Sequence, residues 1–266
     1  MAEDFISAPY ARFSRNILEL FEFVNVMIIQ RTQLNSLTQK TVETFNMFPE
    51  ALRRQIVPDH AYLPLKELVE KGIGVADIVR LYIPLVVELS FCRSVDYYLL
   101  YIAELLALIF HTKPQALKSK EQITLETVLE HSSFEELLET ITEKKVLELS
   151  FMGVLALTDY LKKRLSFELF DGEDDLQKAI RIVEDRNLFI HNRGVVNKVY
   201  LNRLPQTALK LGDKLPVTPD NMFHDVSFLN EMVKATDSRA AGAFGIPRAD
   251  TMPKSKIDEG IMKLPI

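Results

Sequence analysis

An arginine, an amide and a histidine lie close together in the segment RNLFIHNRG, which begins at Arg186. A histidine exchanges a proton near neutral pH, and an arginine carries a permanent charge whose donors meet two phosphate oxygens at once. These groups suit cleavage of RNA, because the 2′-hydroxyl is itself the nucleophile and the reaction needs only acid–base catalysis and charge stabilisation. We therefore expect His191 to handle the proton, Arg186 to stabilise the charge on phosphorus, and Asn187 to orient the imidazole or bind a phosphate oxygen.

The segment is predicted to lie on an amphipathic helix with one apolar stripe. The stripe consists of Leu176, Ile180, Val183 and Ile190. Asn187 falls inside this stripe, and Arg186 and His191 lie at its two margins, so polar groups sit on a surface that should be buried. Buried polar groups require partners, which are supplied by the chain itself, by a ligand or by a second subunit. The simplest structural interpretation is a satisfied core amide between two residues that reach the surface.

The residues from Arg186 to His191 resemble the R-x4-6-H signature of HEPN domains, with Asn187 as the polar residue that typically follows the arginine. The resemblance covers roughly residues 85 to 205 and looks like bacterial HEPN proteins of unknown or defence-related role. It implies an all-α, HEPN-type helical bundle that forms a homodimer, in which two signature helices face each other across a composite cleft. A two-fold axis makes such a contact isologous.

The resemblance also implies a metal-independent endoribonuclease without a cofactor, which acts in growth control or antiviral defence. RNA is then the substrate, and a neutralising or defence-system protein is a further partner. We expect Asn192, Arg193 and Lys198 to bind the RNA. Arg193 stands where HEPN toxins that are silenced by nucleotidylation carry a tyrosine, so that mode of control is not expected. The alternative is a non-catalytic HEPN-like dimer that binds RNA, a nucleotide or a partner protein.

Charge is unevenly distributed along the chain, although the net charge is only −5. Residues 121–175 hold fourteen acids and five bases, whereas residues 176–214 hold eight bases and three acids. The basic stretch surrounds the signature and would attract and position a phosphate-bearing substrate. The alternative is that the two tracts neutralise each other on adjacent helices. The acidic average argues against a broad, non-specific nucleic-acid coat.

Length and composition indicate a helical, globular protein. The chain has 266 residues, of which 47% are hydrophobic, with 9 glycines and no tryptophan, and this favours helices around a sizeable core. The acidic start MAEDFIS lacks the features of a secretory signal, and charges interrupt the most apolar region, Leu81 to Phe110, so no membrane span is expected. Cys92 is the only cysteine, which excludes an intrachain disulfide and suits a reducing cytoplasm.

Other chemistry finds little support in the sequence. The single cysteine cannot form a thiolate cluster, and the remaining histidines lack the spacing of metal ligands. These histidines are His60, His111, His131 and His224. The run from Glu173 to Asp175 is interpreted as the negatively charged first turn of a helix rather than as a magnesium site. Glycine-rich phosphate loops and the G-x-S-x-G motif of serine hydrolases do not occur. We therefore expect no metal and no cofactor.

The helices that position the signature are predicted from apolar periodicity and capping residues. Besides the signature helix, the predicted helices span about 10–45, 66–71, 77–111, 124–131, 133–165, 199–204 and 220–234. Asp77, Thr124 and Ser133 are the expected N-caps. The signature helix follows an acidic loop and is expected to end at Gly194, in the left-handed conformation that glycine adopts readily.

The chain is expected to divide at its proline- and glycine-rich breaks. Residues 1–74 form an N-terminal helical region with an additional long helix, residues 75–212 the HEPN-like domain, and residues 213–266 a C-terminal helix and extension. From Thr236 onward the sequence has glycine, proline and few large apolar groups. This part is interpreted as an extension that is either mobile or docked on another surface.

Overall fold

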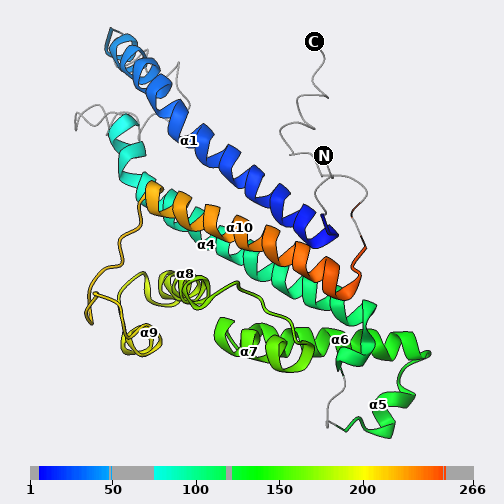
Figure 1. Cartoon of the computed structure of the whole chain (residues 1–266). Helices are drawn as coiled ribbons and strands as arrows, with labels where there is room; N and C mark the ends of the chain where they lie inside the picture. The colour runs from blue at the N-terminus through cyan, green and yellow to red at the C-terminus, as the bar shows by residue number, and fades with distance from the viewer. Residues whose placement is uncertain (1–5, 48, 50–74, 118–121, 248, 250–266) are drawn as a thin grey trace, which may run out of the picture. The chain divides into compact units, whose positions relative to one another are not determined.

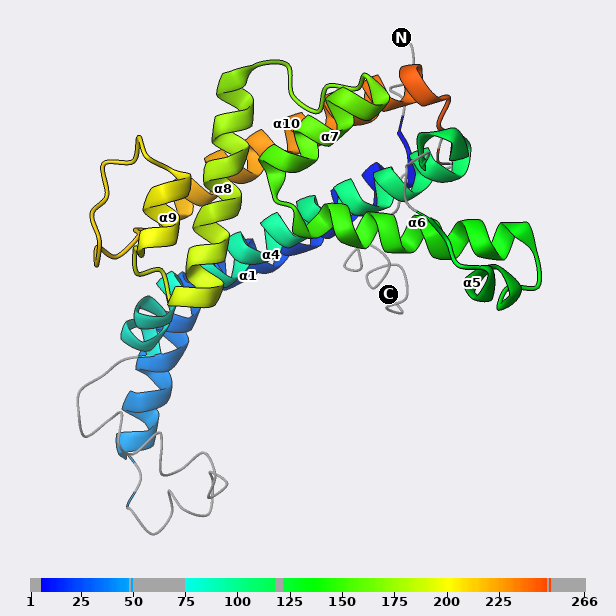
Figure 2. The ribbon, with the colours of Figure 1, turned by 90° about the horizontal axis from the view of Figure 1, so that it is seen from below.

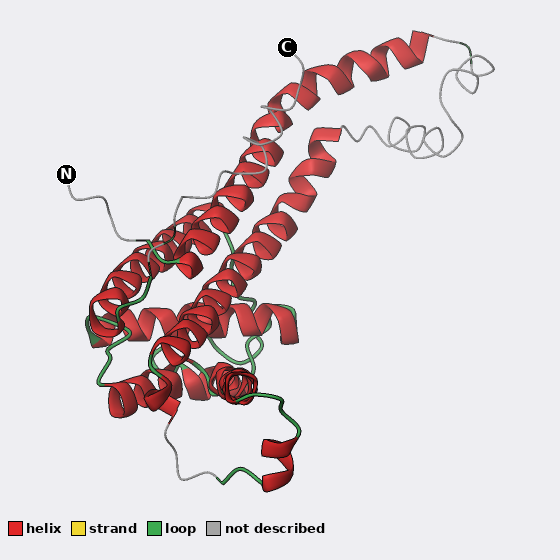
Figure 3. Ribbon diagram, turned by 90° about the vertical axis from the view of Figure 1, so that its right-hand side faces the viewer, coloured by secondary structure: helices red, strands yellow, loops and turns green. Residues whose placement is uncertain are grey.

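The computed structural model describes residues 6–47, 49, 75–117, 122–247 and 249, and within these ranges the chain is all-α, as predicted. Figure 3 shows helices joined by loops, and the β pairing found in these ranges is an isolated antiparallel bridge between Val195 and Lys214. The elements in chain order are α1 (Ala8–Met47), α4 (Val75–Thr112), the 3-10 turn η1 (Pro114–Leu117), α5 (Leu125–Leu129), α6 (Phe134–Phe151), α7 (Val154–Leu165), α8 (Glu173–Asn192), α9 (Lys198–Arg203) and α10 (Pro219–Phe244).

Contacts divide the chain into two units. The larger unit combines Met1–Glu19, which includes the start of α1, with Phe91–Ile266. The smaller unit, Leu20–Ser90, holds the rest of α1 and the beginning of α4. The candidate site residues belong to the larger unit, so the site is a property of that unit alone. The domain boundaries expected at residues 74 and 212 stay sequence predictions.

The core of the larger unit forms where the second part of α4 packs beside the start of α1 and beside α10 (Figure 1). The ring centroids of Phe13 and Tyr101 are 6.0 Å apart, and the Tyr101 hydroxyl donates to the carbonyl of Val233 at 3.3 Å. The buried side chains that α4 contributes to this unit are Phe91, Cys92, Ser94, Val95, Tyr98, Tyr101, Ile102, Leu105, Leu106, Ile109 and Phe110. Burial of this apolar surface supplies the main driving force for folding of the unit.

One stretch of α4 meets the length and composition of a membrane span. Among the described residues, Ile83–Thr112 passes this test, and 44% of its apolar window is buried. The core helix of a soluble protein passes the same test. Two carboxylates of this stretch form ion pairs, Asp96 with Arg186 and Glu104 with Arg12. The expectations of a cytoplasmic location and of no membrane contact therefore stay predictions.

A buried carboxylate anchors the second half of α10. Asp237 accepts hydrogen bonds from the backbone N–H of Ser7, at 2.9 Å, and from the Ser7 hydroxyl. Burial raises the pKa of the Asp237 carboxyl, although the hydrogen bonds from Ser7 and Tyr101 oppose this rise. The prediction of an extension from Thr236 onward is wrong as far as Phe244, because α10 continues to that residue and buries Thr236 and Asp237. Residues 250–266 of the predicted extension lie outside the described residues.

Most helices with strong local signals are confirmed. α1 and the end of α4 lie close to their predicted bounds, and so do α9 and the start of α10. Thr124 and Ser133 cap α5 and α6, each accepting a hydrogen bond from the backbone N–H three residues later. Asp77 lies inside α4, which begins at Val75, so its predicted capping role is wrong. The predicted helix 66–71 lies outside the described residues.

The long helix predicted from Ser133 to Leu165 is in fact two helices, α6 and α7. They are separated at Gly153, whose φ of +80° is a conformation that residues with a side chain rarely adopt. Apolar residues recur on both sides of this break, so periodicity alone predicts one continuous helix. α5 is shorter than predicted as well, since it ends at Leu129 rather than at His131.

Two successive residues in left-handed conformations end α8. Arg193 has a φ of +54° and Gly194 a φ of +71°, so the turn begins one residue before the predicted glycine. The N–H of Arg193 donates to the carbonyl of Phe189, and that of Gly194 to the carbonyl of Leu188. A Cβ atom on Gly194 would lie 2.8 Å from Cε1 of Phe189, so a glycine is required at this position.

The loop between α9 and α10 folds back against the chain that follows α8. The N–H of Val196 donates to the carbonyl of Asp213 at 2.9 Å, and the N–H of Leu215 donates to the carbonyl of Gly194 at 2.8 Å. Figure 2 shows α9 and this loop beside α8. The backbone pairing therefore fixes the loop against the helix that carries the signature.

Candidate functional site

The two halves of α8 differ in how far the predicted apolar stripe is buried. Leu176 and Val183 of the first half are buried, in agreement with the prediction. Ile190 in the last turn is 47% exposed, so the described chain by itself does not bury this residue. The core contacts of the last two turns come from Leu188 and Phe189 instead, which lie on another side of the helix. The end of the apolar stripe is therefore open on this single chain.

The signature residues lie on this open side of α8. Arg186 and Ile190 are four residues apart, as are Asn187 and His191, so the two pairs form neighbouring rows that together span about 140° of the helix surface. His191 is exposed, whereas Arg186 and Asn187 are half-buried. The Oδ1 of Asn187 accepts a hydrogen bond from Arg186, so the interpretation of a satisfied amide agrees with the structure, although Asn187 is only half-buried.

Arg186 is held in place by a carboxylate of α4. Its Nε donates to Oδ1 of Asp96 at 2.9 Å, its Nη2 donates to the same oxygen, and its Nη1 donates to Oδ1 of Asn187 at 3.0 Å. The side chains of Arg186 and Asp96 are 21% and 29% exposed, so the pair is only partly screened by water. No local pattern predicts that Asp96 pairs with Arg186, because the two residues are 90 positions apart.

His191 is not brought together with Arg186 or Asn187 by hydrogen bonds. Within the described part of the chain, Asn187 receives its hydrogen bond from Arg186, and no hydrogen bond joins it to the exposed imidazole. On an ideal helix, Arg186 and His191 project about 140° apart. One copy of the chain therefore holds the arginine and the histidine on the same open face but pointing apart.

The three residues expected to bind RNA differ in their availability. Asn192 donates its side-chain amide to the carbonyl of Val195 and so helps to end α8. Arg193 is exposed, and its carbonyl accepts a hydrogen bond from the ammonium group of Lys214. Lys198 is exposed at the first position of α9. Arg193 and Lys198 remain good candidates for phosphate contacts, whereas the Asn192 amide has a structural role.

The basic stretch is partly neutralised, but not by the acidic tract at residues 121–175. Arg181, Arg186 and Arg203 form ion pairs. Their partners are Asp96, Glu184, Asp185 and Asp225, none of which belongs to that tract. The other bases of the stretch that are exposed are Lys178, Arg193, Lys198, Lys210 and Lys214. The positive potential is therefore concentrated on these side chains, and three of them lie near the end of α8 or in the loop paired to it.

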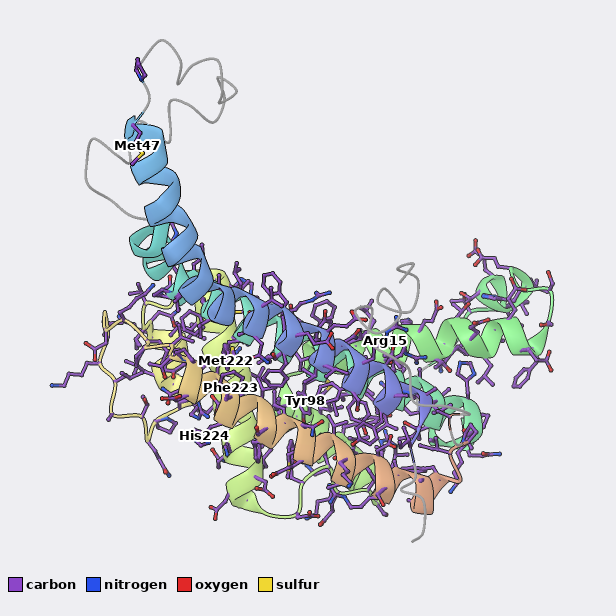
Figure 4. The ribbon with its side chains drawn as sticks, turned by 90° about the horizontal axis from the view of Figure 1, so that it is seen from above. Arg15, Met47, Tyr98, Met222, Phe223 and His224 are labelled. Atoms are coloured by element: carbon purple, nitrogen blue, oxygen red, sulfur yellow. The ribbon has the colours of Figure 1, made fainter. Side chains whose placement is uncertain are left out.

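A pocket of about 350 Å³ lies on a different side of α8. Its apolar walls come from Phe91, Phe189, Leu209, Leu215, Val217 and Met222. The rings of Phe91 and Phe189 meet edge to face, with centroids 5.9 Å apart. Figure 4 shows Met222 and His224 on the early turns of α10, and both residues line the pocket. The pocket therefore combines residues of α4, α8, α9, α10 and the loop that precedes α10.

A charged network forms one side of this pocket. Arg181 donates from Nη1 to Oδ2 of Asp185, at 2.8 Å, and from Nη2 to Oδ1 of Asp225. The Tyr200 hydroxyl donates to the other oxygen of Asp185 at 2.6 Å. Burial raises the pKa of the Asp185 carboxyl more than Tyr200 and Arg181 lower it, and burial beside Asp185 raises the pKa of Tyr200. Burial also lowers the pKa of Arg181, but hydrogen bonds and charges from Asp225 and Asp185 raise it on balance.

Sequence reasoning missed this pocket entirely. His224 was considered above only as a metal ligand, and Asp185 is one of the three acids counted in residues 176–214. Asp225 and Arg181 are 44 residues apart, and they meet because the loop before α10 folds back on α8. A contact over this sequence distance cannot be predicted from the spacing of nearby residues. The charged network of the pocket is therefore seen only in the folded structure.

Comparison with known proteins gives no matching family model, no similar curated protein and no matching solved structure. Among the described residues, no three histidine, cysteine, aspartate or glutamate side chains gather as metal ligands. The acidic run from Glu173 to Asp175 forms the first turn of α8, where negative charge favours the helix dipole.

Proposed function

We propose that this protein is a metal-independent endoribonuclease of the HEPN type, which acts as a homodimer with a composite site. The proposal rests mainly on one observation. Arg186, Asn187 and His191 lie in the last two turns of α8 around the exposed end of an apolar stripe, with Arg186 and His191 at its two margins. His191 and the fixed guanidinium of Arg186 lie on successive turns there, about 140° apart around the helix, and an imidazole and a guanidinium are the groups that cleavage of RNA by its own 2′-hydroxyl requires.

The proposed roles follow from the chemistry of each side chain and, for Arg186, from its contacts. His191 removes the proton of the 2′-hydroxyl, whose oxygen attacks phosphorus while the bond to the 5′-oxygen breaks. The leaving oxygen takes up a proton, so the products are a 2′,3′-cyclic phosphate and a 5′-hydroxyl. Arg186 stabilises the charge on phosphorus. A guanidinium has five donors, and Arg186 directs three hydrogen bonds to Asp96 and Asn187. Two donors remain for phosphate oxygens.

A second copy of the chain would complete the site. Arg186 and His191 diverge on one helix, but a two-fold axis beside α8 brings the histidine of one subunit towards the arginine of the other. Exposed apolar side chains surround the end of α8, namely Ile190, Val195 and Val199, at 47%, 37% and 56%. Apolar residues beside a polar site are typical of a surface that is covered in an assembly.

The second candidate function is binding without cleavage, to RNA, a nucleotide or a partner protein. One observation favours it: Asp96 offsets the charge of Arg186, which weakens the attraction for a phosphate. In either case growth control or antiviral defence is the proposed setting, with a neutralising or defence-system protein as a further partner and the cytoplasm as the location.

Cleavage should survive removal of divalent metal ions. We expect the purified protein to cut single-stranded RNA in excess EDTA and to leave 2′,3′-cyclic phosphate ends, which gel analysis after phosphatase treatment detects. Light scattering should give the mass of a dimer at micromolar concentration. Loss of activity in EDTA that added Mg²⁺ restores would contradict the proposed chemistry, and binding of RNA without cleavage would favour the second candidate.

A further inference from the structure

The pocket beside α8 has the make-up of a small-molecule site that is independent of the signature. Its volume of about 350 Å³ lies at the small end of the range for ligand sites. Aromatic and aliphatic side chains form most of its walls, and hydrogen bonds join four of its polar residues, Arg181, Asp185, Tyr200 and Asp225. Such a combination of apolar walls with a few convergent polar groups is typical of binding pockets.

The carboxylate of Asp225 is the polar group best placed for a ligand. It is only 8% exposed, yet it lines the pocket. Its Oδ1 accepts from Arg181, and no residue that the structure describes donates to its Oδ2. Both oxygens of Asp185, in contrast, are already occupied by Arg181 and Tyr200. A hydrogen-bond donor of a ligand could therefore donate to Oδ2 of Asp225.

The charged residues that line the pocket favour a positively charged ligand over a negatively charged one. Besides His224, the charged groups of the lining are two carboxylates, Asp185 and Asp225, and one guanidinium, that of Arg181, and both carboxylates already bind this guanidinium. An anion would therefore meet two carboxylates and a guanidinium whose charge they already offset. A cation would gain a carboxylate and the faces of aromatic rings, to which positive charge is attracted.

We propose that this pocket binds a small organic cation, namely an ammonium or amidinium group on a compact aromatic body. The cationic group donates to Oδ2 of Asp225, and the aromatic body packs between Phe189 and the loop side chains Leu209 and Val217. The proposal does not rest on the ribonuclease activity, because Arg186, Asn187 and His191 do not line the pocket. Its failure would leave the proposed function untouched, and the reverse also holds.

Three probes of similar size and different charge test the proposal on the full-length protein. Calorimetric titration with benzylamine, benzyl alcohol and benzoate should show saturable binding of benzylamine, about tenfold tighter than that of the neutral alcohol. Benzoate should bind more weakly than either. Equal affinities, tighter binding of benzoate or no saturable binding of benzylamine would each overturn the proposal.

Two variants and a control locate the binding. Asp225→Asn removes the carboxylate charge, and Val217→Phe reduces the volume while keeping the charged network, so each should weaken benzylamine binding about tenfold or more. The second variant decides the matter if the first does not fold. Glu231→Gln removes an exposed carboxylate of the same helix and should leave binding unchanged. Undiminished binding in a folded pocket variant, or an equal loss in the control, would refute this location.

Discussion

Replacing His191 by alanine is expected to lower the rate of RNA cleavage about 10²-fold or more, as the loss of a general acid–base group commonly does. The fold should be unaffected, because the His191 side chain is exposed and accepts or donates no hydrogen bond within the described part of the chain. Single-turnover cleavage of a labelled RNA measures the first effect, and thermal unfolding measures the second. Loss of cleavage with an unchanged melting temperature is therefore the expected combination.

A second exposed histidine provides the matched control. His111 lies in the last turn of α4, and His111→Ala removes the same ring from an exposed helical position away from the signature. This control should cleave RNA at the rate of the unaltered protein. A His191→Ala protein that is stable, dimeric and fully active would contradict the catalytic role of this residue.

Replacing Arg186 by alanine is expected to reduce both cleavage and stability. Cleavage should fall about 10²-fold or more, since a group that stabilises charge in the transition state is lost. The free energy of unfolding should fall by about 1–3 kcal/mol, because Asp96 and Asn187 lose hydrogen bonds in a partly buried setting. Arg186 therefore contributes to stability through its hydrogen bonds, whereas the exposed His191 makes no such contribution.

The double variant Arg186→Ala with Asp96→Ala separates these two effects. Removing Asp96 as well eliminates the unpaired carboxylate, so most of the lost stability should return while cleavage stays low. Arg203→Ala is the control, because Arg203 also pairs with a carboxylate, Glu184, but lies outside the signature. It should leave cleavage unchanged. Recovery of cleavage together with stability in the double variant would show that Arg186 acts only through folding.

The parts of the fold that depend on local signals could be predicted from the sequence. The caps at Thr124 and Ser133 were found because each needs only a side-chain oxygen and an N–H three residues later. The break at Gly153 was missed because apolar periodicity continues across it. The end of α10 after residue 234 was missed because the partner that justifies burying Asp237 is Ser7, 230 residues away.

In the candidate site, too, features set by neighbouring residues could be predicted, whereas contacts between distant segments could not. The placement of Arg186, Asn187 and His191 on one helix follows from local periodicity, and the structure has all three on α8. The fixation of Arg186 by Asp96 and the pocket around Asp225 require helices that meet only in the folded chain. Homodimer formation and catalysis depend on partners beyond this chain, and both stay predictions.

Mixed dimers test the composite site most directly. Chains carrying His191→Ala and chains carrying Arg186→Ala are produced together with different affinity tags, and the mixed dimer is isolated by both tags. If Arg186 of one subunit acts with His191 of the other, the mixed dimer holds one intact site and one that lacks both groups. We predict that it regains about half of the cleavage activity of the unaltered dimer, whereas each homodimeric variant stays inactive. A mixed dimer as inactive as either variant alone would contradict the composite site.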